Sequence, residues 1–154
     1  MNPRLFNYME NFREFDAIEW GHFHKKIVIK VSDYRSALIQ GKYLAKKGIW
    51  VSEFRIESGL NCGGHVFATQ GLLMGPILNE FKEKKEELQE SLFSLYNPAI
   101  IAKGKQGFSR PHPIKITVQG GIGTAAEDNL LHNYFKVDST GWGTPFLLCP
   151  EATT

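Results

Sequence analysis

Runs of apolar and β-branched residues, each the length of a strand, alternate along the chain with segments whose apolar residues recur every three or four positions. The runs of the first kind are Lys26–Val31, Ile49–Ile56, Ile114–Gln119 and Lys136–Trp142. Their length and composition predict β-strands. Because segments of helical periodicity separate them, the pattern predicts βαβ crossovers and a parallel sheet.

Three helices are expected between these strands. The first begins after Asp33, whose carboxylate can cap it, and stops at Gly48. The second covers Ile77–Leu95, with Pro76 in its first turn, and the third spans Ala125–Phe135. The charged face of the second helix is expected to lie in solvent.

Two segments show neither pattern. Residues 1–24 are rich in aromatic side chains and are interpreted as a packing extension, either a loop or a short helix. Residues 97–113 are predicted to form an irregular connector. Residues 25–154 then hold four strand–helix units, whereas a closed eight-stranded βα barrel usually needs about 250 residues. A small open α/β sheet would fit the 154 residues of the chain without strain.

The composition is that of a soluble globular protein, with 42% hydrophobic and 22% charged residues. A formal net charge of +2 favours neither nucleic acid nor a membrane surface as the main partner. Cys62 and Cys149 do not make a disulfide framework, so a cytoplasmic location is expected. No apolar run has the length of a membrane span, and the N-terminus lacks the features of a secretory signal.

Two glycine clusters follow successive predicted strands. Gly120, Gly121 and Gly123 lie between a strand and a helix, and Gly143 with Thr144 follows the next strand. Amides at the start of a helix have no internal partners and carry a partial positive charge, which suits a phosphate. Neighbouring parallel strands lie about 4.8 Å apart, so both turns could contact one phosphate. The alternative is that both clusters are plain turns.

Together with an earlier glycine loop, these clusters resemble the nitronate monooxygenase family, whose members are FMN-dependent TIM barrels. The matching segments are Gly63-Gly64-His65, Gly120-Gly121-Ile122 and Gly143–Ala152. The resemblance covers roughly residues 26–152 and implies that residues 25–154 form the C-terminal half of such a barrel. A half barrel would leave two sheet edges open, so the chain could associate with the missing barrel half or with another copy of itself.

The family resemblance implies specific roles. Gly120, Gly121, Gly143 and Thr144 would bind the FMN phosphate, and Gly63 and Gly64 would lie at the cofactor. His65 would take a proton from the carbon next to the nitro group of a small-molecule substrate. An imidazole suits this role because its unperturbed pKa is about 6.5. Asn61-Cys62 stands where family members commonly have Glu-Ala, which leaves the substrate open.

Two other functions remain open from the sequence. One is a phosphate-binding βα-barrel lyase or isomerase without flavin, and the other is a non-catalytic barrel fragment that needs a partner. Cys62 and His65 have the spacing of metal ligands, but a structural zinc site has four ligands, so no metal is predicted. The remaining candidates are interpreted as surface, packing or anchoring residues: His22, His24, His112, His132, Asp138, Trp142 and Glu151.

Overall fold

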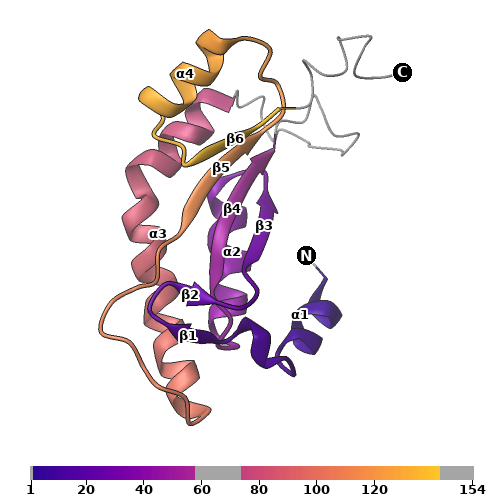
Figure 1. Cartoon of the computed structure of the whole chain (residues 1–154), viewed down its shortest axis with the longest axis vertical. Coiled ribbons are helices and arrows are strands. Elements are labelled where there is room, and N and C mark those ends of the chain that lie inside the picture. The colour runs from indigo at the N-terminus through magenta and orange to yellow at the C-terminus, as the bar shows by residue number, and fades with distance from the viewer. Residues whose placement is uncertain (1, 58–73, 143–154) are drawn as a thin grey trace.

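A four-stranded parallel sheet forms the centre of the molecule (Figure 1). The computed structural model describes residues 2–57 and 74–142. The strands follow one another across the sheet in chain order: β3 (Ile27–Val31), β4 (Val51–Glu57), β5 (Lys115–Gln119) and β6 (Ser139–Gly141). The predicted parallel arrangement of alternating strands and helices is therefore confirmed.

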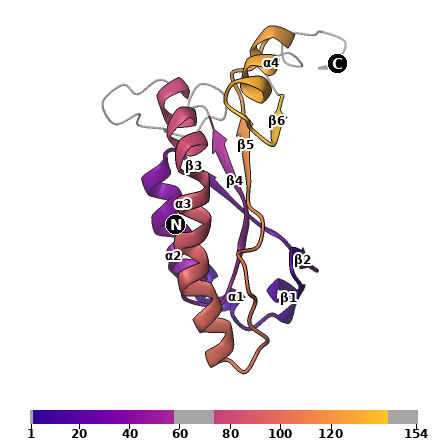
Figure 2. The same cartoon turned by 90° about the vertical axis from the view of Figure 1, so that its left-hand side faces the viewer.

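Two long helices pack together on one face of the sheet (Figure 2). They are α2 (Tyr34–Ala45) and α3 (Met74–Ala102). Asp33 caps α2 as expected, since its Oδ1 accepts a hydrogen bond of 2.6 Å from the Ser36 amide. The third helix, α4 (Ala125–Asn133), connects β5 to β6. Its C-terminal end lies beside the first turns of α3, where Lys82 covers the ring of Tyr134.

The core lies between the sheet and the α2–α3 pair. Register-matched residues from neighbouring strands make two apolar rows across the helix-covered face: Ile29, Phe54 and Ile116, then Val31, Ile56 and Val118. The helices add a buried stripe made of Ala37, Gly41, Leu44, Leu78, Phe81, Leu88, Leu92, Tyr96 and Ile100. Because only alternate strand residues enter this core, the intervening residues face away from the helices.

The N-terminal segment is more ordered than the expected loop or short helix. It contains α1 (Pro3–Met9), a 3-10 turn at Arg13–Phe15, and a hairpin of β1 (Ala17–Glu19) and β2 (His22–Phe23). Figure 1 shows the hairpin near the amino ends of the sheet strands. Trp20 Nε1 donates to the Pro111 carbonyl at 2.9 Å, which ties the hairpin to the segment before β5.

Several predicted boundaries shift in the structure, and two of the shifts have a clear physical cause. The connector expected at 97–113 begins later, because α3 continues through Pro98 to Ala102 and buries Tyr96 and Ile100 in the core. The last strand starts later than expected, because Lys136 has a φ of 57° and cannot extend a strand. Packing decided the first boundary and backbone conformation the second.

The sheet does not close on itself within the described residues, so the fold they show is an open α/β arrangement. Figure 2 shows that the sheet curves, with β6 displaced toward the side that carries β1 and β2. No helix in the described ranges combines the length and apolarity needed to cross a bilayer.

Candidate functional site

The glycine turn after β5 lies against the end of β6. Gly120 and Gly121 have φ values of 85° and 75°, a conformation that residues with a Cβ rarely adopt. The Gly120 amide donates to the Gly141 carbonyl at 3.1 Å. This bond joins the turn after β5 to the end of β6, and it uses the Gly120 N–H that was expected to face a phosphate.

The start of α4 holds a carboxylate of its own. Oε2 of Glu127 accepts hydrogen bonds of 2.9 Å from the amides of Gly123 and Thr124, and one of 3.0 Å from the Thr124 hydroxyl. These bonds, led by that from the Gly123 amide, lower the pKa of Glu127. An ionised side chain therefore occupies two of the amides expected to attract a phosphate.

A pocket of about 360 Å³ opens beside this turn, between α3 and α4. Its wall is mainly apolar, with Glu127 at the turn, and is formed by Met74, Gly75, Leu78, Val118, Gly120, Gly121, Ile122, Glu127, Leu130, Leu131 and Phe135. Pockets of this volume with a few polar groups are typical of small-ligand sites.

Asp128 fixes the end of β6 to α4. Its Oδ1 accepts hydrogen bonds from the Thr140 hydroxyl at 2.6 Å and from Trp142 Nε1 at 3.2 Å. The Thr140 bond is the main cause of a lowered pKa at Asp128. His132 Nε2 lies 3.7 Å from the same oxygen. These contacts hold the residues that lead directly to Gly143 and Thr144.

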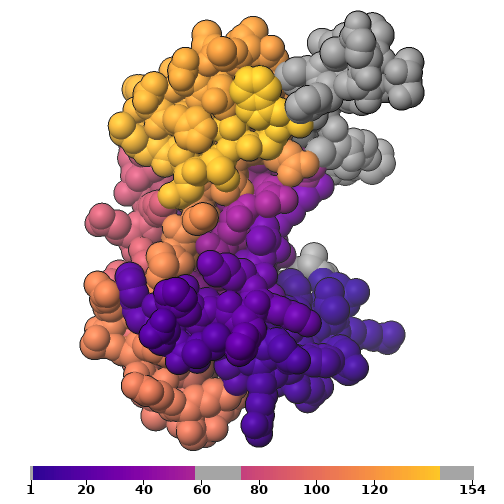
Figure 3. Space-filling model, in the orientation of Figure 1, coloured from indigo at the N-terminus to yellow at the C-terminus, as the bar shows by residue number. Residues whose placement is uncertain are grey.

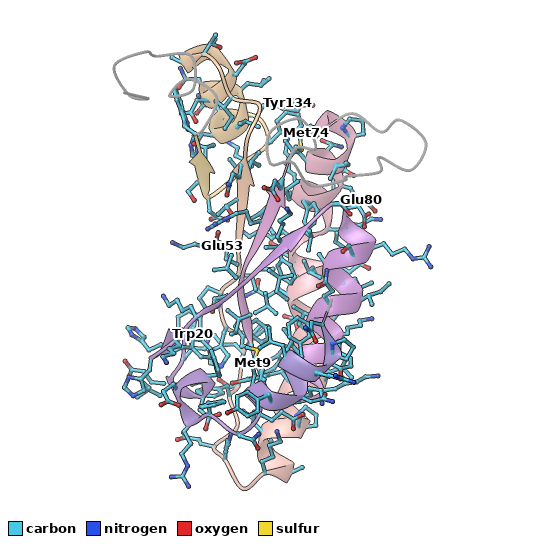
Figure 4. All side chains as sticks on the ribbon, turned by 90° about the vertical axis from the view of Figure 1, so that its right-hand side faces the viewer. Met9, Trp20, Glu53, Met74, Glu80 and Tyr134 are labelled. Atoms are coloured by element: carbon cyan, nitrogen blue, oxygen red, sulfur yellow. The ribbon has the colours of Figure 1, made fainter. Side chains whose placement is uncertain are left out.

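The sheet face opposite the helices is polar. Three register-matched rows cross it: Val28, Glu53 and Lys115, then Lys30, Arg55, Thr117 and Ser139, then Glu57, Gln119 and Gly141. Figure 4 shows Glu53 on the side of the sheet away from α2 and α3. In Figure 3, atoms of the central part of the chain remain visible between the N-terminal segment below and α4–β6 above. We call the residues of these three rows the polar face.

Hydrogen bonds and ion pairs organise the polar face. Glu53 Oε1 accepts from Arg55 Nε at 3.1 Å, from Arg55 Nη2 at 2.8 Å and from the Thr117 hydroxyl at 2.7 Å. Lys30 forms an ion pair with Glu57, whose side chain is 7% exposed. The sequence carried a signal for this face, because Glu53, Arg55 and Glu57 alternate with apolar residues, but the strand pattern was interpreted only as secondary structure.

His112 lies in the loop before β5, as its neighbouring prolines predict, and it is fully buried there. Its ring contacts four aromatic side chains edge-on: Phe23, Trp50, Tyr96 and Phe108. Nδ1 accepts a hydrogen bond of 2.9 Å from the Gly21 amide, so this nitrogen carries no proton. Burial lowers the pKa of His112 to about 4. The residue therefore packs as a neutral side chain that holds the hairpin in place.

Several other residues singled out in the sequence can now be located in the structure. Asp138 is an anchor, as expected, since its Oδ2 accepts from the Ile116 amide and from Lys85 Nζ, each at 2.7 Å. Trp142 is 39% exposed, so it is not a core residue. Gly63, Gly64, His65, Gly143 and Thr144 lie outside the described residues, as do Cys62, Cys149 and Glu151.

Within the described ranges, no group of three or more histidine, cysteine, aspartate or glutamate side chains is arranged to hold a metal ion. Comparison with models of protein families, with curated proteins and with solved structures finds no match to this chain. The geometry of the site is therefore the basis for a functional assignment.

Proposed function

We propose that this chain is the half barrel of an FMN-dependent oxidoreductase of the nitronate monooxygenase type. In this proposal Gly120, Gly121, Gly143 and Thr144 surround the FMN phosphate. Gly63 and Gly64 lie at the cofactor, and His65 acts as the base.

The hydrogen bond from the Gly120 amide to the Gly141 carbonyl, 3.1 Å long, is the observation that carries this proposal. It joins the turn after β5 to the end of β6, at the carboxyl edge of the sheet. Phosphate sites of βα barrels are formed by loops at this edge. The strand order β3-β4-β5-β6, with every pair parallel, is also the order found along a barrel wall.

Three of the backbone amides near the proposed phosphate already have hydrogen-bond partners. The Gly120 amide is bonded to Gly141, and Glu127 holds the amides of Gly123 and Thr124. The phosphate amides would therefore come mainly from Gly143 and Thr144, with Gly120 and Gly121 shaping the turn. A phosphate that also contacted the start of α4 would have to displace the Glu127 carboxylate.

FMN would supply the redox chemistry of the reaction, and the protein would position it. His65 would accept the proton from the carbon next to the nitro group. A neutral imidazole is suited to this step at ambient pH. Asp128 would contribute indirectly, by holding Thr140 and Trp142 and so the approach to Gly143.

The visible spectrum of the purified chain after incubation with FMN and removal of free cofactor tests the proposal. We expect a retained flavin spectrum, and we expect His65→Gln to keep the flavin while losing turnover of a nitronate. A chain that retains no flavin would contradict the cofactor assignment. Normal turnover by His65→Gln would contradict the role of the base.

A further inference from the structure

The polar face is unusual for a parallel sheet. Strands in the middle of such sheets are normally covered on both sides and read as continuous apolar runs. The central strand β4 instead carries Glu53, Arg55 and Glu57 on one side, and Phe54 and Ile56 on the other. Charged groups at these positions need partners, and the bonds of Arg55 use only part of its hydrogen-bonding capacity within the described residues.

Arg55 is held in a fixed orientation with part of its guanidinium unused. Glu53 Oε1 accepts from its Nε and Nη2, and the Thr117 hydroxyl holds the same oxygen at 2.7 Å. A guanidinium has five N–H donors in a planar fork. Its Nη1 donates to no other residue in the described ranges, and the side chain is 43% exposed. An edge of the fork is thus oriented and accessible.

Lys115 adds a second cation beside this fork. It lies directly opposite Glu53 in the register of β4 and β5, and so one step diagonal from Arg55. Its ammonium forms no hydrogen bond or ion pair with any residue that the structure describes, and its side chain is exposed. The face carries three cations, Lys30, Arg55 and Lys115, and two carboxylates, Glu53 and Glu57. The net charge of the polar face is therefore +1.

We propose that the polar face is a binding site for a small molecule that carries a carboxylate, held by the Arg55 fork with Lys115 alongside. A planar two-oxygen anion matches the paired N–H groups of a guanidinium edge. Ser139, in the same row as Arg55, is exposed and supplies a hydroxyl for a second polar group of the ligand. This site does not depend on the flavin proposal.

Binding of succinate to the complete ¹⁵N-labelled chain, followed by NMR amide shifts, tests this inference. We expect saturable shifts in β4 and β5, and none with the neutral analogue succinamide. Arg55→Gln should weaken the affinity by roughly ten- to hundredfold, as expected for a lost charged hydrogen-bond pair. Arg55→Lys should recover little of it, because it restores the charge without the fork.

Two further variants keep the test decisive. Lys115→Gln changes an exposed side chain, so it reports on the site even if Arg55→Gln does not fold, and it should weaken succinate binding. Lys46→Gln removes one positive charge from the end of α2 and should leave the affinity unchanged. Absence of saturable shifts, equal shifts with succinamide, or equal weakening in Lys46→Gln would overturn the proposal and leave the face as a solvated ion-pair network.

Discussion

Glu127 holds backbone amides that a glycine turn would otherwise offer to an anion. Its carboxylate accepts from two backbone amides and one hydroxyl at the start of α4, so it satisfies donors that would otherwise attract an anion. The same bonds that stabilise the helix start therefore compete with a phosphate. This makes Glu127 a sensitive reporter of the proposed FMN site.

Glu127→Ala is predicted to strengthen FMN binding while weakening the start of α4. The variant removes a negative charge and frees the amides of Gly123 and Thr124, so we expect an affinity gain of roughly two- to fivefold. The melting temperature without ligand should fall, because the capping box is lost. Fluorescence titration with FMN and thermal unfolding measure the two effects.

Glu86→Ala is the matched control, because it removes the same charge from an exposed position in α3. It should leave the FMN affinity unchanged. An FMN affinity that falls in Glu127→Ala would show that the carboxylate supports the site and does not compete with the phosphate.

His112 is predicted to make folding stability depend on pH. The pKa of the folded state is about 4, below the unfolded value of about 6.5. The unfolded chain then binds more protons between these values, so the stability present at pH 7 is lost progressively as pH falls from about 6.5 to 4. Urea unfolding at pH 7 and pH 4.5 measures the loss.

His112→Phe should flatten this dependence, because no group titrates at that position. It should also lower stability at pH 7 by about 1–3 kcal/mol, because the Gly21 amide loses its buried acceptor. The exposed His24→Gln is expected to keep the wild-type slope. If His112→Phe retained the full slope between pH 6.5 and 4.5, another group would be responsible for it.

The sequence indicates the polar positions of β4, whereas it does not indicate the burial of His112. Glu53, Arg55 and Glu57 alternate with apolar neighbours, so a polar sheet face was readable from β4 alone. The burial of His112 was not readable, because its contacts come from Phe23, Trp50 and Tyr96, which are distant in sequence. Tertiary contacts of this kind leave no local pattern.

At the scale of elements, local chemistry predicted helix starts better than helix ends. Asp33 caps α2 where expected, and Thr124 begins α4 with a reciprocal bond to Glu127. The end of α3 was missed because residues 97–113 were predicted to be irregular, yet the helix continues through Pro98 and its buried stripe reaches Ile100. Packing energy outweighs the lost backbone bond there.

The contact between α2 and α3 depends on a residue without a side chain. A Cβ at Gly41 would lie 2.7 Å from Leu92 Cδ2 and 3.1 Å from Phe54 Cζ. Gly41→Ala is therefore predicted to destabilise the fold by about 1 kcal/mol, since overpacking exceeds the gain in helix propensity. Urea unfolding measures the change.

A double-mutant cycle with Leu92→Ala separates these effects. Leu92→Ala should cost about 2–5 kcal/mol alone, and adding Gly41→Ala should then be neutral or stabilising, because the methyl group occupies vacated space. Equal costs of Gly41→Ala in both backgrounds would show that the helices do not meet as closely as described.

At the scale of the molecule, the described residues leave two edges of the sheet unpaired and one of its faces without helices. β3 and β6 each lack a neighbour on one side among the described strands. Exposed edges of this kind favour pairing with another chain. The alternation of strands and helices predicted the parallel sheet, but periodicity carries no information about closure, so the barrel remains a proposal.

The open edges predict that the chain associates with a second half barrel, including another copy of itself. Light scattering over a range of concentrations should show a mass that rises above that of one chain. Val28→Lys, which places a charge on the exposed side of the edge strand β3, should reduce the effect. A constant monomeric mass at all concentrations would contradict this prediction.

The central claim is that the turns after β5 and β6 together hold a phosphate. The most direct measurement is the affinity of the chain for FMN compared with riboflavin, which has the same ring system and no phosphate. We predict that FMN binds and that riboflavin binds at least about tenfold more weakly. Equal affinities, or no binding of FMN, would contradict the claim.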